Sequence, residues 1–531
     1  MIALKTVSSL EKVFFGSLPK TEEKRGSMLC NERYNFQICI LNDGSYLRNV
    51  SLSIEGIDRE YVTVRQVVEI PGSKVYVDND DYVFFNDNDQ HMFPDLLRPV
   101  KTDELFLRAQ QLTVLWCTVH AKEGLKAGEY KLKLTVKCGE ENVSTEYTLD
   151  VIDAFLPESD LIYTNWIHYD AIANFYHAEP FSKRFYELLG TFIDSAVQHG
   201  MNMLYTPLFT PPLDTLVGRE RLTVQLVEVT KDEKGYKFGF SELEKFIDFA
   251  LRRGIKYFEM SHLTTQWGAK ACPKIIAKTS EGEKKIFGWE TSSSGEEYKA
   301  FLLAFLPTLD KFLKKKGIDK QCYFHISDEP APANYAQFKE VFDFIRPLIK
   351  DYKVMDATED ISLVDHPVIS IHNLTKKLPE KCWVYYCCTA YKNYVPNRMF
   401  NMPSQRNRIL GFLLYLNGAS GFLHWGFNFY NSHCSTRPLD PFLESDAGGG
   451  WPSGDTFIVY PGTDGAWDSL RHEVFYDGLQ DRMALIALEK KIGRDKVVEV
   501  LKSEGLDGYR IYPHSDKWHL EFRRKINEML K

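Results

Sequence analysis

The sequence predicts an α/β protein in which a (β/α)8 TIM barrel follows an N-terminal β-sandwich, and three observations favour this architecture. The chain has 531 residues, which is too long for one ordinary hydrophobic core. Its first part alternates apolar and polar residues with a period of two, as half-buried strands do. After Leu156 and Pro157, short apolar runs alternate with amphipathic stretches, which is the pattern of βα units. We therefore expect a sandwich domain over residues 1–155 and a barrel domain over residues 156–531.

The clearest strands of the predicted sandwich form a hairpin. Apolar residues alternate with lysine and threonine over residues 130–137, and a second alternation covers residues 143–151. The polar turn Gly139–Asn142 separates the two runs. Period-two patterning on both sides of a polar turn is typical of a hairpin with one buried face.

The barrel is predicted from eight short apolar runs, most of them followed by a helical stretch. The expected strands begin near Ile162, Asn202, Tyr257, Cys322, Val354, Val368, Trp383 and Phe422. The expected helices include Ser182–His199, Ser241–Arg253, Glu297–Lys315, Tyr335–Lys350 and Gln405–Leu416. Eight units favour a closed barrel over an open sheet, and no GxGxxG or Walker-type loop follows a strand. From about Asp468 onward, a helical segment is expected to pack against the outside of the barrel.

Composition and charge argue against several classes of protein. The formal net charge of −8 disfavours nucleic acid or an anionic membrane as the main partner. The N-terminus lacks the apolar region of a secretory signal, and no run of about 18 apolar residues exists, so we expect a cytoplasmic protein without a membrane span. The chain is rich in aromatic residues (14%), whose faces bind sugars but also fill large cores.

The residues that could carry chemistry follow the predicted strands. In a barrel of this kind the reactive groups lie at the carboxyl ends of the strands, so these side chains converge on one rim. Acids, imidazoles, amides and aromatic rings together suit a pocket for a polar, ring-shaped ligand. We expect substrate contacts from Trp166, His168, His262, Gln266, Trp267, Tyr385, Tyr386, Trp425 and Asn428.

Asp328 and Glu329 are the candidate catalytic residues. They close the segment Cys322–Pro330, whose apolar first half predicts a buried strand, and Pro330 is expected to hold Glu329 in an extended conformation. Adjacent carboxylates repel, so one tends to be protonated near neutral pH while the other stays ionised. Glycoside hydrolysis needs this division, because one group donates a proton and the other stabilises positive charge. An exposed acid pair at the start of a helix is the alternative, but the buried strand and the aromatic rim favour catalysis.

The adjacency of the two carboxylates narrows the mechanism. Two neighbouring side chains cannot easily flank a sugar from opposite faces, as a separate acid and nucleophile must. They suit substrate-assisted hydrolysis, in which the 2-acetamido oxygen of the substrate attacks the anomeric carbon. Asp328 would then orient the acetamide N–H, and Glu329 would protonate the leaving oxygen and later activate water, with net retention.

Two alternative functions are also compatible with the sequence. The chain could be a non-catalytic carbohydrate-binding barrel. It could also be a glycosidase for sugars without an acetamido group, with a distant carboxylate such as Glu259 as nucleophile.

We expect neither a metal nor another cofactor. Four histidines follow predicted strands, but the HxH of metal-dependent barrel hydrolases and the HExxH of zincins are missing. Sugar contacts or structural hydrogen bonds are the favoured roles of these histidines. The segment Asp440–Asp455 is predicted to be an insertion that closes over the pocket.

The barrel part resembles the catalytic domain of glycoside hydrolase family 123, within the wider group of DUF4091 proteins. The matching stretches are Trp166–Asp170, Pro207–Thr215, His262–Ala269, His325–Pro330, Trp383–Cys387, Gly421–Asn428 and Gly454–Gly462. The resemblance covers most of residues 160–490, and a β-sandwich before the barrel also fits the family.

This resemblance implies a retaining exo-acting β-N-acetylgalactosaminidase that uses the substrate-assisted route on a terminal β-linked N-acetylhexosamine. The acid pair of the family carries over onto Asp328 and Glu329. Its tyrosines carry over onto Tyr385 and Tyr386, where a hydroxyl would bond the acetamido oxygen. Trp425 would match a pocket aromatic that packs against the acetamido methyl group or the sugar face.

Overall fold

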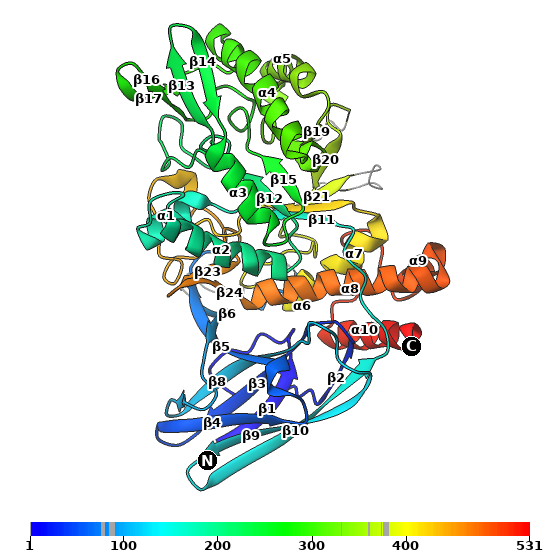
Figure 1. Cartoon of the computed structure of the whole chain (residues 1–531). Coiled ribbons are helices and arrows are strands. Elements are labelled where there is room, and N and C mark those ends of the chain that lie inside the picture. Colours follow the sequence, from blue (N-terminus) through cyan, green and yellow to red (C-terminus); the bar gives the residue numbers. More distant parts are fainter. Residues whose placement is uncertain are drawn as a thin grey trace.

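The computed structural model describes residues 2–75, 80–83, 91–330, 332–358, 362–372, 374 and 382–531. Within this part of the chain, two antiparallel-rich sheets lie at one end and a closed barrel with its helices at the other (Figure 1). No helix among these residues has both the length and the apolar character that crossing a membrane requires.

The N-terminal part is a sandwich of two five-stranded sheets. One sheet has the order β1-β3-β8-β5-β6 and the other β2-β10-β9-β4-β7. Their bounds are β1 Ile2–Ser8, β2 Arg25–Leu29, β3 Tyr34–Asn42, β4 Leu47–Glu55, β5 Val62–Gly72, β6 His91–Pro99, β7 Leu105–Leu107, β8 Gln111–Val119, β9 Gly128–Cys138 and β10 Glu141–Ile152. β9 and β10 pair antiparallel from Cys138 and Glu141, so the expected hairpin is confirmed. Its inward residues, such as Leu134 and Tyr147, are fully buried in the sandwich core.

The eight predicted barrel strands form a closed, all-parallel barrel in chain order, which confirms the predicted fold class. The strands are β11 Ile162–Asn165, β12 Met203–Thr206, β15 Tyr257–Met260, β18 Cys322–Phe324, β19 Lys353–Asp356, β20 His366–Ser370, β21 Trp383–Tyr385 and β22 Gly421–His424. The main barrel helices are α1 Tyr169–Tyr176, α2 Lys183–Gln198, α3 Ser241–Leu251, α4 Glu296–Lys316, α5 Tyr335–Ile345, α6 Ser404–Arg408 and α7 Leu410–Asn417. Ser182 caps α2 through a hydrogen bond from the Phe185 N–H, as its position before the apolar stretch predicts.

Two insertions at the carboxyl-end rim of the barrel join into one small sheet. β13 Glu228–Asp232 and β14 Gly235–Gly239 follow β12, whereas β16 Ile275–Thr279 and β17 Gly282–Phe287 follow β15. The sheet has the order β14-β13-β16-β17. A short hairpin of β23 Val459–Gly462 and β24 Gly465–Asp468 precedes the C-terminal helices.

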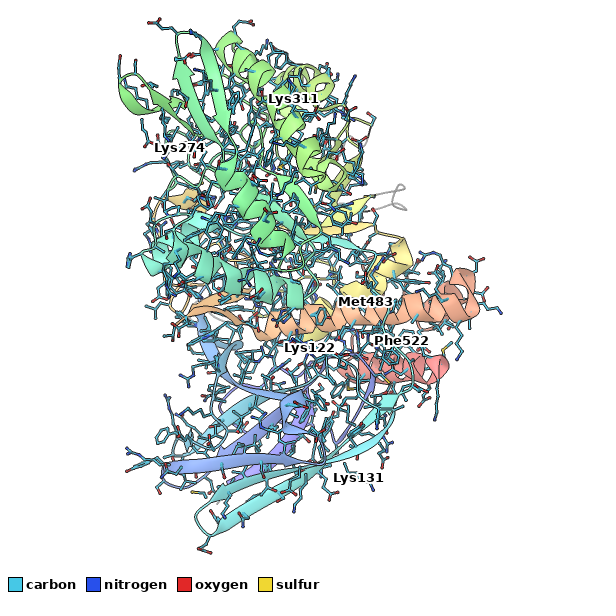
Figure 2. All side chains as sticks on the ribbon, in the orientation of Figure 1. Lys122, Lys131, Lys274, Lys311, Met483 and Phe522 are labelled. Carbon is cyan, nitrogen blue, oxygen red and sulfur yellow. The ribbon has the colours of Figure 1, made fainter. Side chains whose placement is uncertain are left out.

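The C-terminal segment is helical, as expected, and it lies between the barrel and the sandwich. Its helices are α8 Leu470–Ile492, α9 Arg494–Ser503 and α10 Asp516–Leu530. α8 packs on α6 and α7, and α10 packs on α8 and β2 (Figure 1). Met483 and Phe522, labelled in Figure 2, belong to the same buried cluster as the barrel core. A Cβ at Gly411 would lie 1.7 Å from the Gly478 carbonyl oxygen, so these glycines allow α7 and α8 to touch through their backbones.

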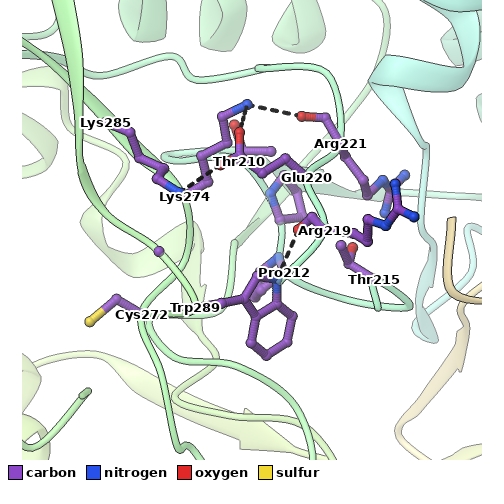
Figure 3. Close-up of a pocket in the computed structure, with 12 residues that line it drawn as sticks. Thr210, Pro212, Thr215, Arg219, Glu220, Arg221, Cys272, Lys274, Lys285 and Trp289 are labelled. Carbon is purple, nitrogen blue, oxygen red and sulfur yellow. Dashed lines mark hydrogen bonds and ion pairs between the residues drawn. The ribbon is translucent and has the colours of Figure 1, made fainter. Parts of the chain in front are cut away.

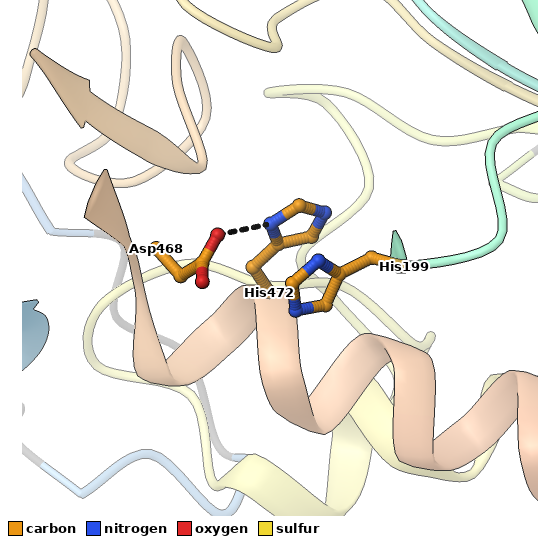
Figure 4. A group of neighbouring side chains, drawn as sticks. All are labelled: His199, Asp468 and His472. Carbon is orange, nitrogen blue, oxygen red and sulfur yellow. Dashed lines mark ion pairs between the residues drawn. The ribbon is translucent and has the colours of Figure 1, made fainter. Parts of the chain in front are cut away.

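A buried polar network joins α8 to the sandwich. Glu473 is inaccessible and pairs with Arg33 at 2.8 Å and Arg65 at 2.6 Å. Beside it the rings of His199 and His472 stack with centroids 3.7 Å apart, next to Asp468 (Figure 4). Burial opposes ionisation of Glu473, but the two arginines outweigh it and hold the pKa of this carboxyl well below its usual range. Because the charges are paired, this polar interface can exclude water.

Candidate active site

A cavity of about 740 Å³, including its open mouth, lies at the carboxyl ends of the barrel strands. Its volume is typical of a small-molecule site. The lining residues are Trp166, Leu213, Asp214, Gln266, Trp267, His325, Asp328, Glu329, Ala357, Tyr385, Cys387, Cys388, Leu423, Trp425 and Trp451. Four tryptophans and three carboxylates thus meet in one pocket, which can hold a ring with both apolar faces and hydroxyl groups.

Asp328 and Glu329 both line this cavity, on the segment that follows β18. The Asp328 carbonyl accepts a hydrogen bond from the Trp267 N–H at 2.7 Å, and the Tyr385 hydroxyl donates to Glu329 Oε1 at 2.7 Å. Asp328 is half-buried, whereas Glu329 is exposed toward the mouth. The pair is therefore held by the loop that carries Trp267 and by the end of β21, which carries Tyr385.

The expectation that Pro330 holds Glu329 in an extended conformation is wrong. Glu329 has φ 43°, in the left-handed region that a non-glycine residue rarely adopts. The preference imposed by a following proline is a local steric effect, and contacts such as the Tyr385 hydrogen bond outweigh it here. Backbone outliers of this kind concentrate at functional sites.

Burial and the charge of Glu329 raise the pKa of Asp328 well above its usual range, although His325 acts in the opposite direction. The shift favours a proton held between the two adjacent carboxyls. Such a proton belongs to the pair as a unit. The arrangement can deliver a proton and still present one negative charge to a developing cation.

His325 lies under the acid pair as a buried cation between two carboxylates. Its Nε2–H donates to Glu259 at 2.6 Å and its Nδ1–H to Asp356 at 3.1 Å. Burial alone would lower the pKa of His325, but these two hydrogen bonds outweigh it and raise the pKa to about 10. Because both ring N–H groups are used, His325 acts through its charge and its position.

Glu259 is beneath the floor of the cavity and is fully buried. Its oxygens accept hydrogen bonds from the Trp166 indole N–H at 2.7 Å, the Thr164 hydroxyl at 2.6 Å and His325. A carboxylate with both oxygens engaged in this way is poorly placed to attack a sugar. Its position therefore counts against Glu259 as the separate nucleophile.

Of the nine expected substrate contacts, five line the cavity and four lie behind it. Trp166, Gln266, Trp267, Tyr385 and Trp425 line the cavity. Trp267 is 46% exposed, so a sugar face could stack on it, whereas Trp166 is held by its bond to Glu259.

His168 and Asn428 lie behind Trp425. His168 Nε2–H donates to the Trp425 carbonyl at 2.9 Å, and Asn428 Oδ1 accepts from the His168 N–H at 2.8 Å. Burial and the neighbouring Arg221 lower the pKa of His168 to about 3, so it is neutral and accepts from Arg221 at Nδ1. Both residues thus position the segment that carries Trp425.

His262 and Tyr386 are also fully covered. The His262 ring stacks on His325 with centroids 4.2 Å apart, and burial followed by the His325 charge lowers the pKa of His262 far below its usual range. The Tyr386 ring contacts His424 edge-on, and its hydroxyl has no hydrogen-bond partner among the described residues. In this structure, contact of either residue with a substrate would require a shift of the pocket wall.

The inferred insertion Asp440–Asp455 carries a tryptophan into the cavity. Trp451 lines the pocket and lies edge-on to Trp425, and the Trp425 indole N–H donates to Asp455 at 3.1 Å. The end of β5 fixes the insertion from the sandwich side: Ser73 donates to Asp446 at 2.5 Å and Lys74 to the Gly450 carbonyl at 3.0 Å. The sandwich therefore helps to shape the pocket.

Two further lining residues, Asp214 and Trp451, were not singled out from the sequence. Each lies on a long loop without hydrophobic periodicity, and the single acid of the Pro-rich segment after β12 was the available signal for Asp214. Burial raises the pKa of Asp214, against the opposing effect of the nearby His433.

A smaller cavity of about 330 Å³ adjoins the loop that carries Asp214 (Figure 3). Glu220 pairs there with Lys274 at 2.9 Å and Lys285 at 2.6 Å, and the Trp289 indole N–H donates to the Arg219 carbonyl at 3.1 Å. These contacts tie the loop to β17 and its neighbours, so they fix the backbone on one side of the main cavity.

Three groups of side chains among the described residues have the spacing of metal ligands. They are His262–His325–Asp356, Asp214–His433–Cys434 and His199–Asp468–His472. His325 has no free lone pair in the first group, because both its nitrogens donate to carboxylates. In the third group Asp468 already pairs with Arg65 at 2.8 Å. The second group borders the main cavity and has the most suitable donor set.

Comparisons with known proteins identify the family of this chain. The family described as "Glycoside hydrolase 123, catalytic domain" matches residues 166–488. A solved family 123 glycoside hydrolase from Clostridium perfringens, studied for glycolipid glycan hydrolysis, is similar in structure with a TM-score of 0.76 at 15% sequence identity, covering 100% of this chain and 98% of that one. Among curated proteins, none matches this chain.

Other solved barrels are far less similar. A GH10 xylanase with a bacterial Ig-like domain, from termite gut, has a TM-score of 0.32 at 10% identity, covering 82% of this chain and 94% of that one. A family 5 mannosidase from Rhizomucor miehei has a TM-score of 0.31 at 12% identity, covering 67% and 97%. At these scores the two enzymes carry no argument about this chain.

Proposed function

Because the chain belongs to glycoside hydrolase family 123, we propose that it is a retaining, exo-acting β-N-acetylgalactosaminidase that uses the 2-acetamido group of its substrate as the nucleophile. The family match makes it a glycosidase that acts on carbohydrate. The adjacency of Asp328 and Glu329 on one side of the cavity carries the finer proposal. Two neighbours on one strand end cannot reach both faces of a sugar, so the attacking group must come from elsewhere.

The acetamido oxygen of the substrate is a suitable nucleophile in this pocket. Asp328 accepts the acetamide N–H and stabilises the positive charge that develops on the oxazolinium-like intermediate. Glu329, which is nearer the mouth, protonates the leaving oxygen and then removes a proton from the attacking water. The attack by the substrate's own oxygen and the later attack by water each invert the anomeric carbon, so the configuration is retained.

The resting proton distribution fits this division of roles. The raised pKa of Asp328 favours its protonated form in the free protein, and an N–H donor from the substrate favours its ionised form. The mechanism requires that Glu329 carries the proton when the glycosidic bond breaks. Tyr385, which donates to Glu329 in the free protein, is placed to turn to the acetamido oxygen.

The terminal sugar could be part of a glycolipid glycan, as for the Clostridium perfringens enzyme, and the open mouth of the cavity would leave room for the aglycone.

The test is hydrolysis of nitrophenyl β-glycosides of N-acetylgalactosamine, N-acetylglucosamine and galactose by the wild type, Asp328→Asn and Glu329→Gln. We expect turnover of the acetamido sugars alone, its loss in Asp328→Asn and a smaller fall in Glu329→Gln. A nitrophenyl leaving group needs little protonation, so Glu329→Gln should retain more activity on it than on an alkyl glycoside. Turnover of the galactoside would instead indicate a protein nucleophile, and sugar binding without any turnover would refute the mechanism.

A further inference from the structure

Asp214 and Gln266 form a second polar pair in the cavity, apart from the acid pair. Asp214 lies on the loop between β12 and β13, and Gln266 lies on the loop between β15 and β16. The Asp214 backbone N–H donates to Gln266 Oε1 at 2.8 Å, so the Gln266 side chain is fixed against the backbone of Asp214. This bond also orients the amide, because Oε1 must be the acceptor and Nε2 is left as a donor.

Each member of the pair has one buried polar atom without a partner among the described residues. These atoms are Oδ2 of Asp214, an acceptor, and Nε2 of Gln266, a donor. Gln266 is only 9% exposed, and both residues line the cavity. A buried polar atom without a partner costs free energy, so such atoms next to a cavity indicate a ligand that supplies the missing hydrogen bonds.

The backbone around the pair is held in a strained conformation. Asp214 has φ 42° and Trp267, which follows Gln266, has φ 62°. The Trp267 N–H donates to the Asp328 carbonyl, so one residue separates Gln266 from the catalytic strand end. The Ser435 hydroxyl fixes the Asp214 carbonyl from the other side at 2.7 Å. These contacts fix the backbone of Asp214 and Gln266 relative to Asp328 and Glu329, and side chains that select a substrate need such fixed positions.

We propose that Asp214 and Gln266 are specificity-determining residues that bind ring hydroxyls of the terminal sugar, with Asp214 accepting from one hydroxyl and Gln266 donating to it or to its neighbour. This rests on the proposed function, in which Asp328 and Glu329 take the groups at C1 and C2. The hydroxyls at C3, C4 and C6 then remain for the rest of the cavity. A carboxylate and an amide side by side suit two neighbouring hydroxyls, or one hydroxyl that both donates and accepts.

The experiment is a cycle of enzyme variants against sugar analogues. kcat/KM is measured for the wild type and Asp214→Asn on the nitrophenyl β-N-acetylgalactosaminide and on its 3-deoxy, 4-deoxy and 6-deoxy forms. A hydrogen bond from a sugar hydroxyl to a buried carboxylate is worth roughly 10- to 100-fold in kcat/KM. We expect the kcat/KM of the wild type to be lower by about this factor on one deoxy sugar than on the parent sugar. For Asp214→Asn, the kcat/KM values on the parent and on that deoxy sugar should be nearly equal.

Two further variants keep the test decisive. Gln266→Glu keeps the acceptor for the Asp214 N–H but replaces the free donor, and it should show the same coupling at the same or the adjacent hydroxyl. Ser435→Ala removes a contact to the Asp214 backbone and leaves the carboxylate, so it should change all four sugars by the same factor. The proposal is overturned if, for both Asp214→Asn and Gln266→Glu, each deoxy substitution lowers kcat/KM by the same factor in the variant as in the wild type.

The outcome separates this proposal from the proposed function and from metal binding. Wild-type turnover of the parent sugar without any coupling refutes the hydroxyl contacts alone, whereas no turnover of acetamido sugars refutes the proposed function. Asp214 also lies within ligand spacing of His433 and Cys434. Activity that falls on treatment with a chelator, together with a thiolate absorption band on adding Co²⁺ that Cys434→Ser removes, would make Asp214 a metal ligand and overturn the proposal.

Discussion

Replacement of Glu259 by glutamine tests the role of the buried charges under the catalytic pair. The substitution is nearly isosteric, and the amide oxygen can still accept from Trp166 and His325. The amide NH₂ then faces the Thr164 hydroxyl, which can rotate to accept. The change therefore removes one negative charge and leaves the hydrogen bonds in place.

The magnitude follows from the pKa of His325, which the two carboxylates raise from an ordinary value of 6.5 to about 10. Loss of one of two charged partners lowers the pKa by roughly 1–3 units, which corresponds to about 1.4–4 kcal/mol of folding free energy. A histidine with a raised folded pKa contributes its full stability below pH 6.5 and loses it as the pH rises toward 10. The variant should therefore be less stable than the wild type by this amount near pH 6, and the difference should shrink toward pH 10.

Urea unfolding at pH 6 and pH 10 measures this difference, and hydrolysis of the acetamido substrate is followed on the same samples. We expect Glu259→Gln to retain turnover within about 100-fold, because Glu259 acts through His325. A destabilisation of the same size at both pH values would refute the electrostatic argument. Loss of turnover by 10⁴-fold or more in a folded variant, with partial rescue by azide, would make Glu259 the nucleophile and refute the assisted mechanism.

Three other perturbations follow from the structure. Tyr385→Phe removes the hydroxyl that donates to Glu329 in the free protein and that we propose orients the acetamido oxygen during its attack, so kcat should fall by roughly 10-fold in steady-state kinetics with a smaller change in KM; a change in KM alone would contradict this. Burial raises the pKa of Asp455 to about 7, so the folded state loses stability as the pH rises from about 4 to 7. In urea unfolding, Asp455→Asn should therefore be more stable than the wild type at pH 8, by at most about 4 kcal/mol. A stability difference of the same size at pH 4 and pH 8 would contradict this. Glu473→Gln removes the buried negative charge that Arg33 and Arg65 share and leaves Asp468 as the carboxylate paired with Arg65, so we expect a loss of about 3–5 kcal/mol in unfolding experiments at pH 7; a loss below about 1 kcal/mol would show that Asp468 or water compensates for the lost charge.

The sequence alone determined the backbone framework of the barrel. Each of the eight strands begins within two residues of its predicted start. A short buried strand between amphipathic helices is an apolar run, which can be recognised from the local sequence alone. The sandwich hairpin was predicted in the same way from the alternation of apolar and polar residues with a period of two. The position of Asp328 and Glu329 at a strand end followed from the same pattern, and the family that it suggested matches residues 166–488.

Only the tertiary structure decided which rim residues face the cavity. Adjacent residues such as Tyr385 and Tyr386 lie on opposite sides of the cavity wall, because successive side chains of a strand alternate and closure of the barrel sets which face is inside. Asp214 and Trp451 come from loops whose course depends on contacts with distant segments, including the sandwich. Glu329 adopts φ 43° against its local preference, since hydrogen bonds from other strands outweigh the sterics of its neighbours. Local sequence specifies which elements form, whereas long-range packing specifies where the side chains of the site point.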